Sequence, residues 1–209
     1  MSRLLGKFIT LEGTEGVGKT TNLEFMKDWL KRAGIKFTVS REPGGTPLAE
    51  ELREMLLQKR DESVDATAEL LMIFAARAQH INQVIRPALA RGEWVLCDRF
   101  TDATYAYQGA GRGLSLEVIE SLESLVQGEL RPDLTVVLDI DVETGLQRAG
   151  QRAELDRFES EAVEFFHRVR AGYQARVASA PERYRVINAG QTLPEVQRDI
   201  EVVLSELTR

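Results

Sequence analysis

The stretch from Gly13 to Thr20 reads GTEGVGKT, and it decides the fold because it matches G-x-x-x-x-G-K-[ST], the pattern of a phosphate-binding loop. An apolar run, Phe8 to Glu12, precedes it, and the helical stretch TTNLEFMKDWLKRAG overlaps its end. The pattern is specific in that order of strand, loop and helix. Gly16 and Gly18 permit the tight turning that points backbone N–H groups at an anion. A chance glycine-rich turn would not need a strand before it and a helix after it, and both are present here. The loop therefore predicts a bound nucleoside triphosphate.

The loop also supplies groups suited to a triphosphate. The Lys19 ammonium can reach the outer phosphates, and the Thr20 hydroxyl can hold Mg²⁺. The residues predicted to bind the triphosphate are Gly13, Thr14, Glu15, Gly16, Val17, Gly18, Lys19, Thr20 and Thr21. None of Asn22, Asn82 or Asn188 is followed by Lys, so the N-K-x-D base reader of a GTPase is missing. The chain is also too short for a large motor or transporter ATPase.

Short apolar runs alternate with amphipathic stretches along the chain, which predicts the α/β class. Five runs rich in Val, Ile, Leu or Phe are predicted strands: Phe8 to Glu12, Phe37 to Arg41, Trp94 to Asp98, Leu134 to Asp139 and Arg185 to Asn188. Most lack polar alternation, as expected of parallel strands covered on both faces. The sequence therefore predicts a five-stranded parallel sheet flanked by helices.

The spacing of apolar residues predicts amphipathic helices between the strands. One helix is predicted to begin at Thr192 with a capping box. A second is predicted from Ser115 to near Gly128, and a third from about Ala66 to Arg91. The segment REPGGTPL, Arg41 to Leu48, holds two Pro and two Gly directly after a strand. It is predicted to be a loop at the carboxyl end of that strand.

The composition limits the kinds of partner. With 27 Lys and Arg against 33 Asp and Glu, the formal net charge is −6, which argues against a whole surface that binds nucleic acid or an anionic membrane. No apolar run approaches the roughly 18 residues of a membrane span, and the start lacks a signal-peptide pattern. Cys97 lies in the run WVLCD and is predicted to be a core residue. We expect one cytoplasmic domain spanning residues 1–209.

Arginines follow two of the predicted strands and lie on the long predicted helix. Arg41 stands beside Glu42, Arg99 follows Asp98, and Arg77 lies on the helix. Ligands of open α/β sheets lie beyond the carboxyl ends of the strands, so Arg41 and Arg99 should reach the same crevice as the phosphate-binding loop. Guanidinium groups bind phosphate through two parallel hydrogen bonds. These arginines predict a phosphate acceptor beside the triphosphate.

Six motifs occur in order between Gly13 and Glu159: GTEGVGKTT, REPGGT, FAAR, DRF, AYQGAGRG and LDRFE. With these motifs the chain resembles the bacterial thymidylate kinases. The resemblance implies the P-loop nucleoside monophosphate kinase fold in a homodimer, with Mg²⁺ as cofactor. It implies transfer of the γ-phosphoryl group of ATP to dTMP, giving ADP and dTDP for dTTP synthesis. Two alternatives stay open: a kinase for another nucleoside monophosphate, such as dUMP or dGMP, and a P-loop switch in which ATP drives dimerisation without transfer.

The resemblance also implies which residues bind dTMP. They are Glu15, Arg41, Glu42, Arg53, Ile73, Phe74, Arg77, Arg99, Thr104, Tyr107 and Gln108. Arg41, Arg77 and Arg99 are implied to hold the dTMP phosphate, and Arg53 to help in the base and phosphate pocket. Glu15 is implied to contact the 3′-hydroxyl of the sugar.

Other positions of the resemblance concern the sugar and the base. Tyr107 is implied to leave no room for a 2′-hydroxyl, while Thr104 and Gln108 approach the thymine edge. The family usually has a thymine-stacking aromatic residue four positions before Arg77. That position is Ile73 here, with Phe74 next to it, and either can face the base on a helix.

The segment Gln147 to Glu161, here called the lid, is charged throughout, and we expect a mobile flap, with a solvated helix face as the alternative. Glu15 is followed by Gly16, without the loop arginine of one family branch. The resemblance is therefore to the branch with its catalytic arginine in the lid, where Arg152 is the best match. Arg148 is implied to bind ATP, and Arg148 or Arg157 could replace Arg152. The implied catalytic residues are Lys19, Arg152, Arg99 and Asp98, with Mg²⁺ held by Thr20 and Asp98, directly or through water.

Overall fold

The computed structural model describes residues 6–151, 156–159 and 161–208. Within them, parallel strands form a five-stranded sheet in the order β2-β3-β1-β4-β5. The strands are β1 (Phe8–Glu12), β2 (Phe37–Arg41), β3 (Trp94–Asp98), β4 (Leu134–Asp139) and β5 (Tyr184–Asn188). The predicted α/β class and all five predicted strands are confirmed, and β5 begins one residue earlier than expected.

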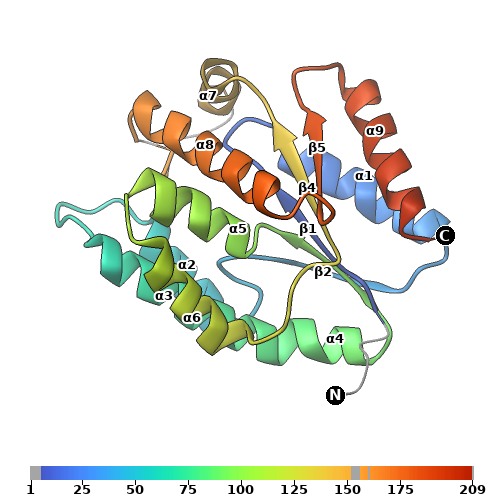
Figure 1. Cartoon of the computed structure of the whole chain (residues 1–209), viewed down its shortest axis with the longest axis horizontal. Coiled ribbons are helices and arrows are strands. Elements are labelled where there is room, and N and C mark those ends of the chain that lie inside the picture. The colour runs from blue at the N-terminus through green and yellow to red at the C-terminus, as the bar shows by residue number, and fades with distance from the viewer. Residues whose placement is uncertain (1–5, 152–155, 160, 209) are drawn as a thin grey trace.

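The helices connect the strands as crossovers (Figure 1). They are α1 (Lys19–Arg32), α2 (Pro47–Leu57), α3 (Ala66–His80), the π-helix η1 (Ile81–Ile85), α4 (Arg86–Ala90), α5 (Thr101–Thr104), the π-helix η2 (Tyr105–Gly111), α6 (Leu116–Gln127), α7 (Val142–Gly150), α8 (Val163–Ser179) and α9 (Leu193–Glu206). The helices predicted to begin at Thr192, at Ser115 and at about Ala66 are confirmed. The Glu195 carboxylate accepts hydrogen bonds from the backbone N–H and the hydroxyl of Thr192, as part of the predicted capping box.

The two faces of the sheet are covered by different helices (Figure 1). Ile9 and Leu11 of β1 pack in a core with residues of α1 and α9. Phe8 packs on the other face with residues of η1 and α4, and the residues of α8 and η2 pack beside β4 and β5. Because side chains alternate along a strand, Glu12 lies on the same face as Phe8. This alternation directs a carboxylate into the interior directly before the phosphate-binding loop.

One predicted boundary is wrong, and part of a second segment takes its helical alternative. The predicted loop Arg41 to Leu48 ends early, because Thr46 caps α2, accepting the Ala49 N–H at 3.2 Å, and Pro47 already begins the helix. The first part of the predicted lid is helical, since α7 continues to Gly150. The Pro and Gly residues of the first segment concealed the start of α2, and the charged residues of the second concealed the end of α7.

The interior also confirms the prediction for Cys97. Cys97 is fully buried, and burial raises the pKa of its thiol well above the usual range, so it is a core residue as predicted. In the part of the chain that the structure describes, no helix combines the length and the apolar character needed to cross a bilayer.

Candidate active site

The phosphate-binding loop has the conformation that its sequence predicts. Gly16 and Gly18 have φ values of 71° and 87°, in the left-handed region that glycine tolerates best. A Cβ atom on Gly16 would lie 1.8 Å from the carbonyl oxygen of Gly145, so the loop also packs tightly against α7. The Lys19 ammonium donates hydrogen bonds to the carbonyl oxygens of Gly13 at 3.1 Å and Thr14 at 2.9 Å. It therefore lies within the curve of the loop, where phosphates bind in proteins of this type.

Two pockets open beside this loop. The first, here called the loop pocket, is lined by Glu15, Gly16, Val17, Gly18, Lys19, Thr20, Ala149 and Glu159. The second, here called the strand-end pocket, is lined by Glu15, Lys19, Glu42, Pro43, Arg53, Leu56, Leu57, Ile73, Arg77, Asp98, Arg99, Phe100, Ala103, Thr104, Tyr107, Gln108, Asp156, Phe158 and Glu159. Glu15, Lys19 and Glu159 line both pockets. A ligand in one pocket would therefore lie next to a ligand in the other.

Glu15 lies at this junction in a dense hydrogen-bond network. Its Oε1 accepts hydrogen bonds from Arg99 at 2.8 Å and from the Tyr107 hydroxyl at 2.7 Å, and its Oε2 lies 3.9 Å from the Lys19 ammonium. Burial alone would raise the pKa of Glu15, but the Arg99 and Lys19 charges and the Tyr107 hydroxyl lower it to about 2. Glu15 is therefore an ionised acceptor at neutral pH.

Arg99 has an unusual backbone conformation that positions its side chain. Its φ is 63°, which side-chain-bearing residues rarely adopt and which costs of order 1 kcal/mol or more. The Arg99 N–H donates to the carbonyl of Leu11 at 3.0 Å, and the next N–H, that of Phe100, donates to Glu12 at 2.6 Å. The guanidinium donates to the Tyr173 hydroxyl at 3.1 Å as well as to Glu15. Contacts on both sides hold the turn after β3.

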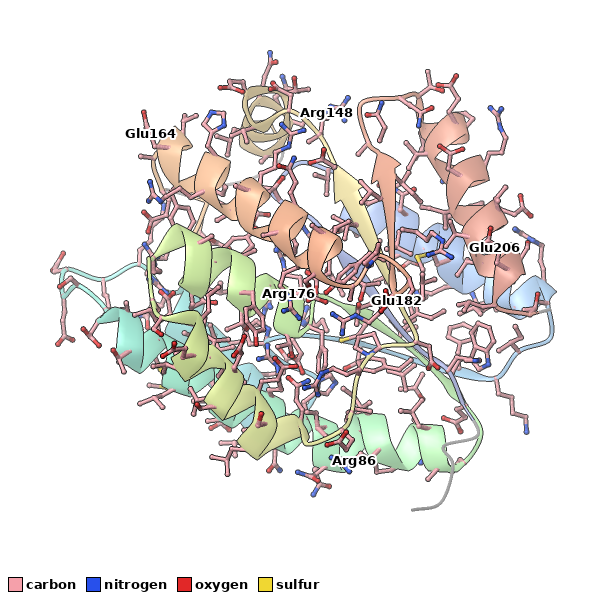
Figure 2. All side chains as sticks on the ribbon, in the orientation of Figure 1. Arg86, Arg148, Glu164, Arg176, Glu182 and Glu206 are labelled. Atoms are coloured by element: carbon pink, nitrogen blue, oxygen red, sulfur yellow. The ribbon has the colours of Figure 1, made fainter. Side chains whose placement is uncertain are left out.

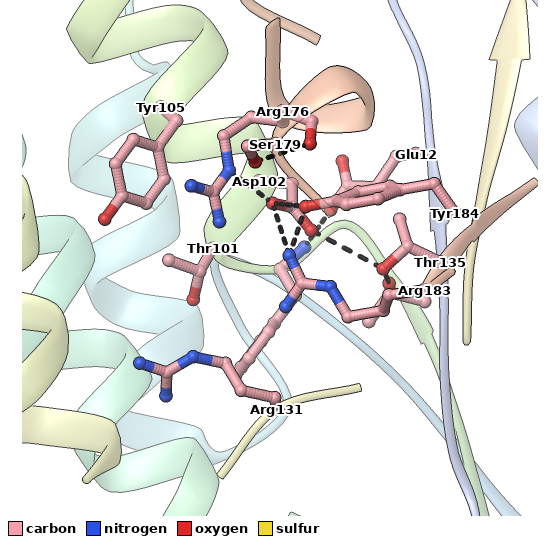
Figure 3. Close-up of polar contacts among 12 residues, drawn as sticks. Glu12, Thr101, Asp102, Tyr105, Arg131, Thr135, Arg176, Ser179, Arg183 and Tyr184 are labelled. Atoms are coloured by element: carbon pink, nitrogen blue, oxygen red, sulfur yellow. Dashed lines mark hydrogen bonds and ion pairs between the residues drawn. The ribbon is translucent and has the colours of Figure 1, made fainter. Parts of the chain in front are cut away.

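Glu12 is a fully buried acid at the base of this arrangement. It also accepts a hydrogen bond from the Tyr173 hydroxyl at 2.8 Å. Burial, together with the nearby charge of Asp102, raises the pKa of Glu12 to about 8, although Arg99 and both hydrogen bonds oppose this shift. Figure 3 shows Asp102 close by, where it accepts hydrogen bonds from Arg176 at 2.9 Å and from Tyr184 at 2.6 Å.

We expect Glu12→Gln to flatten the pH dependence of stability. A carboxyl whose pKa rises from 4.5 to about 8 on folding stabilises the fold fully below pH 4.5, and this contribution is lost as the pH rises through 8. Glutamine keeps the shape but does not titrate. Urea unfolding at pH 5 to 8 should therefore show wild-type stability falling relative to the variant, by at least about 1 kcal/mol. Parallel profiles would show that Glu12 is already ionised at pH 5.

Arg77 is buried at the opposite side of the strand-end pocket. Its Nε donates to Glu42 at 2.7 Å and its Nη2 to the Thr104 hydroxyl at 2.9 Å, while its Nη1 has no partner among the described residues. Gln108 donates from Nε2 to Glu69 at 2.8 Å. The Glu42 carboxylate therefore already balances the Arg77 charge, and Nη1 is a buried donor beside the pocket.

The structure separates the two candidate partners of a base. Ile73 lines the strand-end pocket, whereas Phe74 packs in a core cluster with Leu70, Tyr105 and Ile119. The Phe74 ring lies beneath Arg77, with its centroid 4.8 Å from Cζ. Ile73 is thus the pocket residue, and Phe74 supports the guanidinium from the interior.

The structure does not bring every predicted site residue into the pockets. Arg41 is half exposed, forms a two-oxygen ion pair with Glu50, and lines neither pocket. Arg148 lies at the end of α7 (Figure 2), where it donates to the Ala189 carbonyl at 3.1 Å. Thr21 lies in α1, away from the pocket lining. Arg152 lies outside the described residues.

Three residues of the site were not predicted: Tyr173 and Glu69 lie outside the six motifs, and Phe158 lies in LDRFE but was given no role. Tyr173 connects Glu12 to Arg99, and Glu69 holds Gln108. Phe158 reaches the strand-end pocket from the lid, and its ring meets Tyr107 edge to face with centroids 6.2 Å apart. Each is supplied by a helix or segment distant in sequence, so spacing along the chain does not reveal it.

The predicted magnesium ligands are suited to the ion. Magnesium prefers oxygen ligands and keeps several waters, and it often takes only one or two carboxylates from the protein. Thr20 offers a hydroxyl in the loop pocket, and Asp98 offers a carboxylate in the strand-end pocket. Asp98 Oδ1 is buried and accepts no hydrogen bond from the described residues. The donor set therefore fits magnesium bound together with a triphosphate.

Fold and site together define a class of protein. A phosphate-binding loop on a parallel sheet opens into a pocket that adjoins a second, arginine-lined pocket at the strand ends. Such a site holds a nucleoside triphosphate with a phosphate acceptor at its outer end, as in the P-loop nucleotide kinases.

Comparison with known proteins identifies the family. The sequence profile described as Thymidylate kinase matches residues 11–200. The chain is 69% identical over 201 residues to the thymidylate kinase of Teredinibacter turnerae, covering 96% of this chain and 98% of the relative. It is 60% identical over 204 residues to that of Ectopseudomonas mendocina, covering 98% and 97%. The crystal structure of thymidylate kinase from Ehrlichia chaffeensis aligns with a TM-score of 0.76 at 33% identity, covering 95% of this chain and 98% of that one. The chain belongs to the thymidylate kinase family, and the resemblance is confirmed.

Proposed function

We propose that this protein transfers the γ-phosphoryl group of ATP to dTMP, giving ADP and dTDP, as a step of dTTP synthesis. The observation that carries the proposal is the junction of the two pockets at Glu15 and Lys19, because an acceptor bound in one pocket would lie beside a triphosphate bound in the other. We further propose that residues 1–209 act as one kinase domain in the cytoplasm, with residues 147–161 as a mobile lid.

Catalysis then consists of positioning and charge neutralisation. The attacking oxygen belongs to a nucleotide phosphate, which is already ionised at neutral pH, so no general base is needed. Lys19 neutralises the β- and γ-phosphates, and Arg99 and Arg53 hold the acceptor phosphate in the strand-end pocket. Magnesium, bound with ATP near Thr20 and Asp98, supplies further positive charge when present.

The base end of the strand-end pocket favours thymine over cytosine. Gln108 donates its amide N–H to Glu69, which leaves the carbonyl oxygen as an acceptor for a ring N–H. Arg77 Nη1 is an unused donor for a ring carbonyl. Thymine carries a carbonyl next to a ring N–H, whereas cytosine carries an amino group next to an unprotonated ring nitrogen. Because the Arg77 charge is balanced by Glu42, we assign this arginine to the base rather than the phosphate.

The lid arginines have different surroundings. Arg157 donates to Glu69 at 2.6 Å and to the Leu56 carbonyl at 2.7 Å, and Arg148 is held at Ala189. Both are engaged away from the junction of the pockets. We therefore retain Arg152 as the proposed lid residue that neutralises the transferring group, in the manner of an arginine finger.

A panel of acceptors tests the proposal and includes a matched pair for the sugar. ADP formation should depend on dTMP. An ATP-driven dimerisation switch, in contrast, would need no acceptor. Among other monophosphates, dUMP should be phosphorylated more slowly than dTMP and dGMP not measurably. If dGMP or another nucleotide exceeds dTMP in kcat/KM, the alternative acceptor is correct.

We expect kcat/KM for UMP to be at least about 100-fold lower than for dUMP. The two nucleotides differ only in the 2′-hydroxyl, which the Tyr107 ring should exclude. The Tyr107 ring is buried beneath Arg99, with Cζ 4.7 Å from its centroid, so it cannot easily move aside. Tyr107→Ala should reduce the discrimination, whereas Tyr107→Phe keeps the ring and should retain it. Equal kcat/KM for UMP and dUMP with wild type would show that Tyr107 does not exclude the hydroxyl.

We also propose a homodimer through the outer face of α2, α3 and α6. These three helices lie side by side (Figure 1), and they carry large apolar side chains that the monomer exposes. The residues are Leu48 and Met55 on α2, Leu71 on α3, and Val118 and Leu125 on α6. Leu125 is 80% exposed, which is unusual for leucine unless a partner covers it.

The double variant Leu71→Asp, Leu125→Asp should convert the dimer to a monomer, because it would bury four charges in a two-fold interface. Light scattering after gel filtration should give twice the 23.5 kDa chain mass for wild type and the chain mass for the variant. Val202→Asp is the control, since Val202 is 56% exposed on α9 and lies outside this face. A dimer that survives the double variant must use another surface.

A further inference from the structure

A buried chain of hydrogen bonds extends from the strand-end pocket into the interior behind Arg77. Arg77 and His80 lie three residues apart on α3, so both face the same side of the helix. The Glu42 carboxylate lies between them, accepting from Arg77 Nε at 2.7 Å and from His80 Nδ1 at 2.8 Å. Ser40 Oγ lies 2.6 Å from the other ring nitrogen, Nε2. Arg77, Glu42 and His80 are each at least 97% buried.

The chemistry of Glu42 fixes the direction of these bonds. Burial alone would raise the pKa of Glu42, but Arg77 and His80 lower it, so the carboxylate is ionised and can only accept. Nδ1 of His80 must therefore carry a proton. In the neutral imidazole, Nε2 then accepts a hydrogen bond from the Ser40 hydroxyl. The order of Ser40, His80 and Glu42 is that of a hydrolase triad, but Ser40 lines neither pocket, and a Cβ on Gly45 would lie 2.5 Å from its Oγ.

The Glu42 and Arg77 pair differs from two other pairs in the same protein. Arg170 with Asp139, and Arg41 with Glu50, use both Nε and Nη2 of arginine on the two oxygens of one carboxylate. This side-on fork is the strong geometry for arginine and a carboxylate. Glu42 accepts from Arg77 through Oε2 alone, while its Oε1 is turned toward His80. Arg77 Nη2 is thereby left for Thr104 and for the Phe100 carbonyl.

We propose that His80 is a positioning residue for recognition of the acceptor nucleotide. By donating to Oε1, it fixes the Glu42 carboxylate with only Oε2 facing Arg77 Nε, which leaves Arg77 Nη2 to the Thr104 hydroxyl. Thr104 then accepts from Arg77, and its own proton stays available to a ligand in the strand-end pocket. The rings of Phe74 and Phe100, with centroids 4.8 Å and 5.3 Å from Arg77 Cζ, restrain the guanidinium in this orientation. The inference rests on the proposed assignment of Arg77 to the base of dTMP.

Two amide substitutions at His80 form a matched test. Asparagine places its amide nitrogen near Nδ1 and can still donate to Glu42, whereas glutamine reaches toward Ser40 and leaves Glu42 Oε1 without its donor. His80→Gln should raise the KM for dTMP about tenfold, the usual effect of one lost hydrogen bond to a charged group. His80→Asn should stay within about threefold of wild type. In both variants kcat and the KM for ATP should change less than threefold, because the loop pocket is untouched.

A purely structural role for His80 would lower the thermal stability of both variants and change both KM values together. The proposal is overturned if Asn and Gln raise the KM for dTMP equally, or if neither raises it. If one variant fails to fold, His80→Leu replaces it, with the expectation for Gln. Failure of the proposed function is a separate result, because it would appear as wild type that does not phosphorylate dTMP.

Discussion

A Lys19→Met protein is expected to keep its fold and to lose at least about 10³-fold in kcat, because it lacks the mobile cation nearest the β- and γ-phosphates. Methionine has nearly the length of lysine and no charge. Among the described residues, Lys19 has no ion pair closer than 3.9 Å, and its hydrogen bonds go to the Gly13 and Thr14 carbonyls. The substitution therefore removes charge from the transferring group and leaves the loop geometry to Gly16 and Gly18.

The measurement is kcat with saturating ATP and dTMP, with circular dichroism and the melting temperature as controls for the fold. Lys31→Met is a suitable comparison, since Lys31 is exposed at the end of α1 and pairs with the exposed Asp28 at 3.0 Å. That variant should stay within twofold of wild type, because an exposed ion pair contributes about 0 to 1 kcal/mol. A folded Lys19→Met enzyme with near-normal kcat would contradict the assignment of the loop pocket to ATP.

The edge strands β2 and β5 are partly exposed, but the sequence predicted the sheet well because β1, β3 and β4 are largely buried on both faces. Such strands appear as continuous apolar runs, and all five occur at the predicted places. The same reasoning located the phosphate-binding loop, since its pattern is local and its glycines are needed for a φ of 71° at Gly16 and 87° at Gly18. Local patterns thus sufficed for the triphosphate side of the site.

The acceptor side depended on contacts between distant segments, and here the sequence was less informative. Arg41 ends β2 and Arg99 follows β3, but only Arg99 lines the strand-end pocket. The spacing of residues does not show that Arg41 pairs with Glu50 outside the pocket. It also does not show that contacts with Tyr173 and Glu12 hold Arg99 and the turn after it at the pocket. Periodicity also could not choose between Ile73 and Phe74, since both are buried. The choice depends on which neighbour fills the interior.

The contrast between these two arginines gives a prediction with a large effect. Arg99→Ala should lower kcat/KM for dTMP at least about 10³-fold, because it removes the guanidinium that we propose holds the acceptor phosphate, beside Glu15 at the junction of the pockets. It also leaves the buried Glu15 carboxylate with a hydrogen bond from Tyr107 and without its closest cation. Arg99→Lys keeps the charge but cannot reach Glu15 and Tyr173 with one planar group, so we expect it to recover only part of the loss.

Arg41→Ala provides the comparison, because the resemblance implies that Arg41 also holds the acceptor phosphate, whereas the structure pairs it with Glu50 outside the pockets. An exposed pair of this kind contributes about 0 to 1 kcal/mol, so kcat/KM for dTMP should fall less than fivefold. Both variants are to be measured at equal saturation with ATP, and their melting temperatures show whether the turn after β3 survives without the Arg99 side chain. Equal losses in the two variants would mean that Arg41 swings from Glu50 into the strand-end pocket when dTMP binds. A small loss in Arg99→Ala would instead leave Arg53, which lines the same pocket, as the arginine that holds the phosphate.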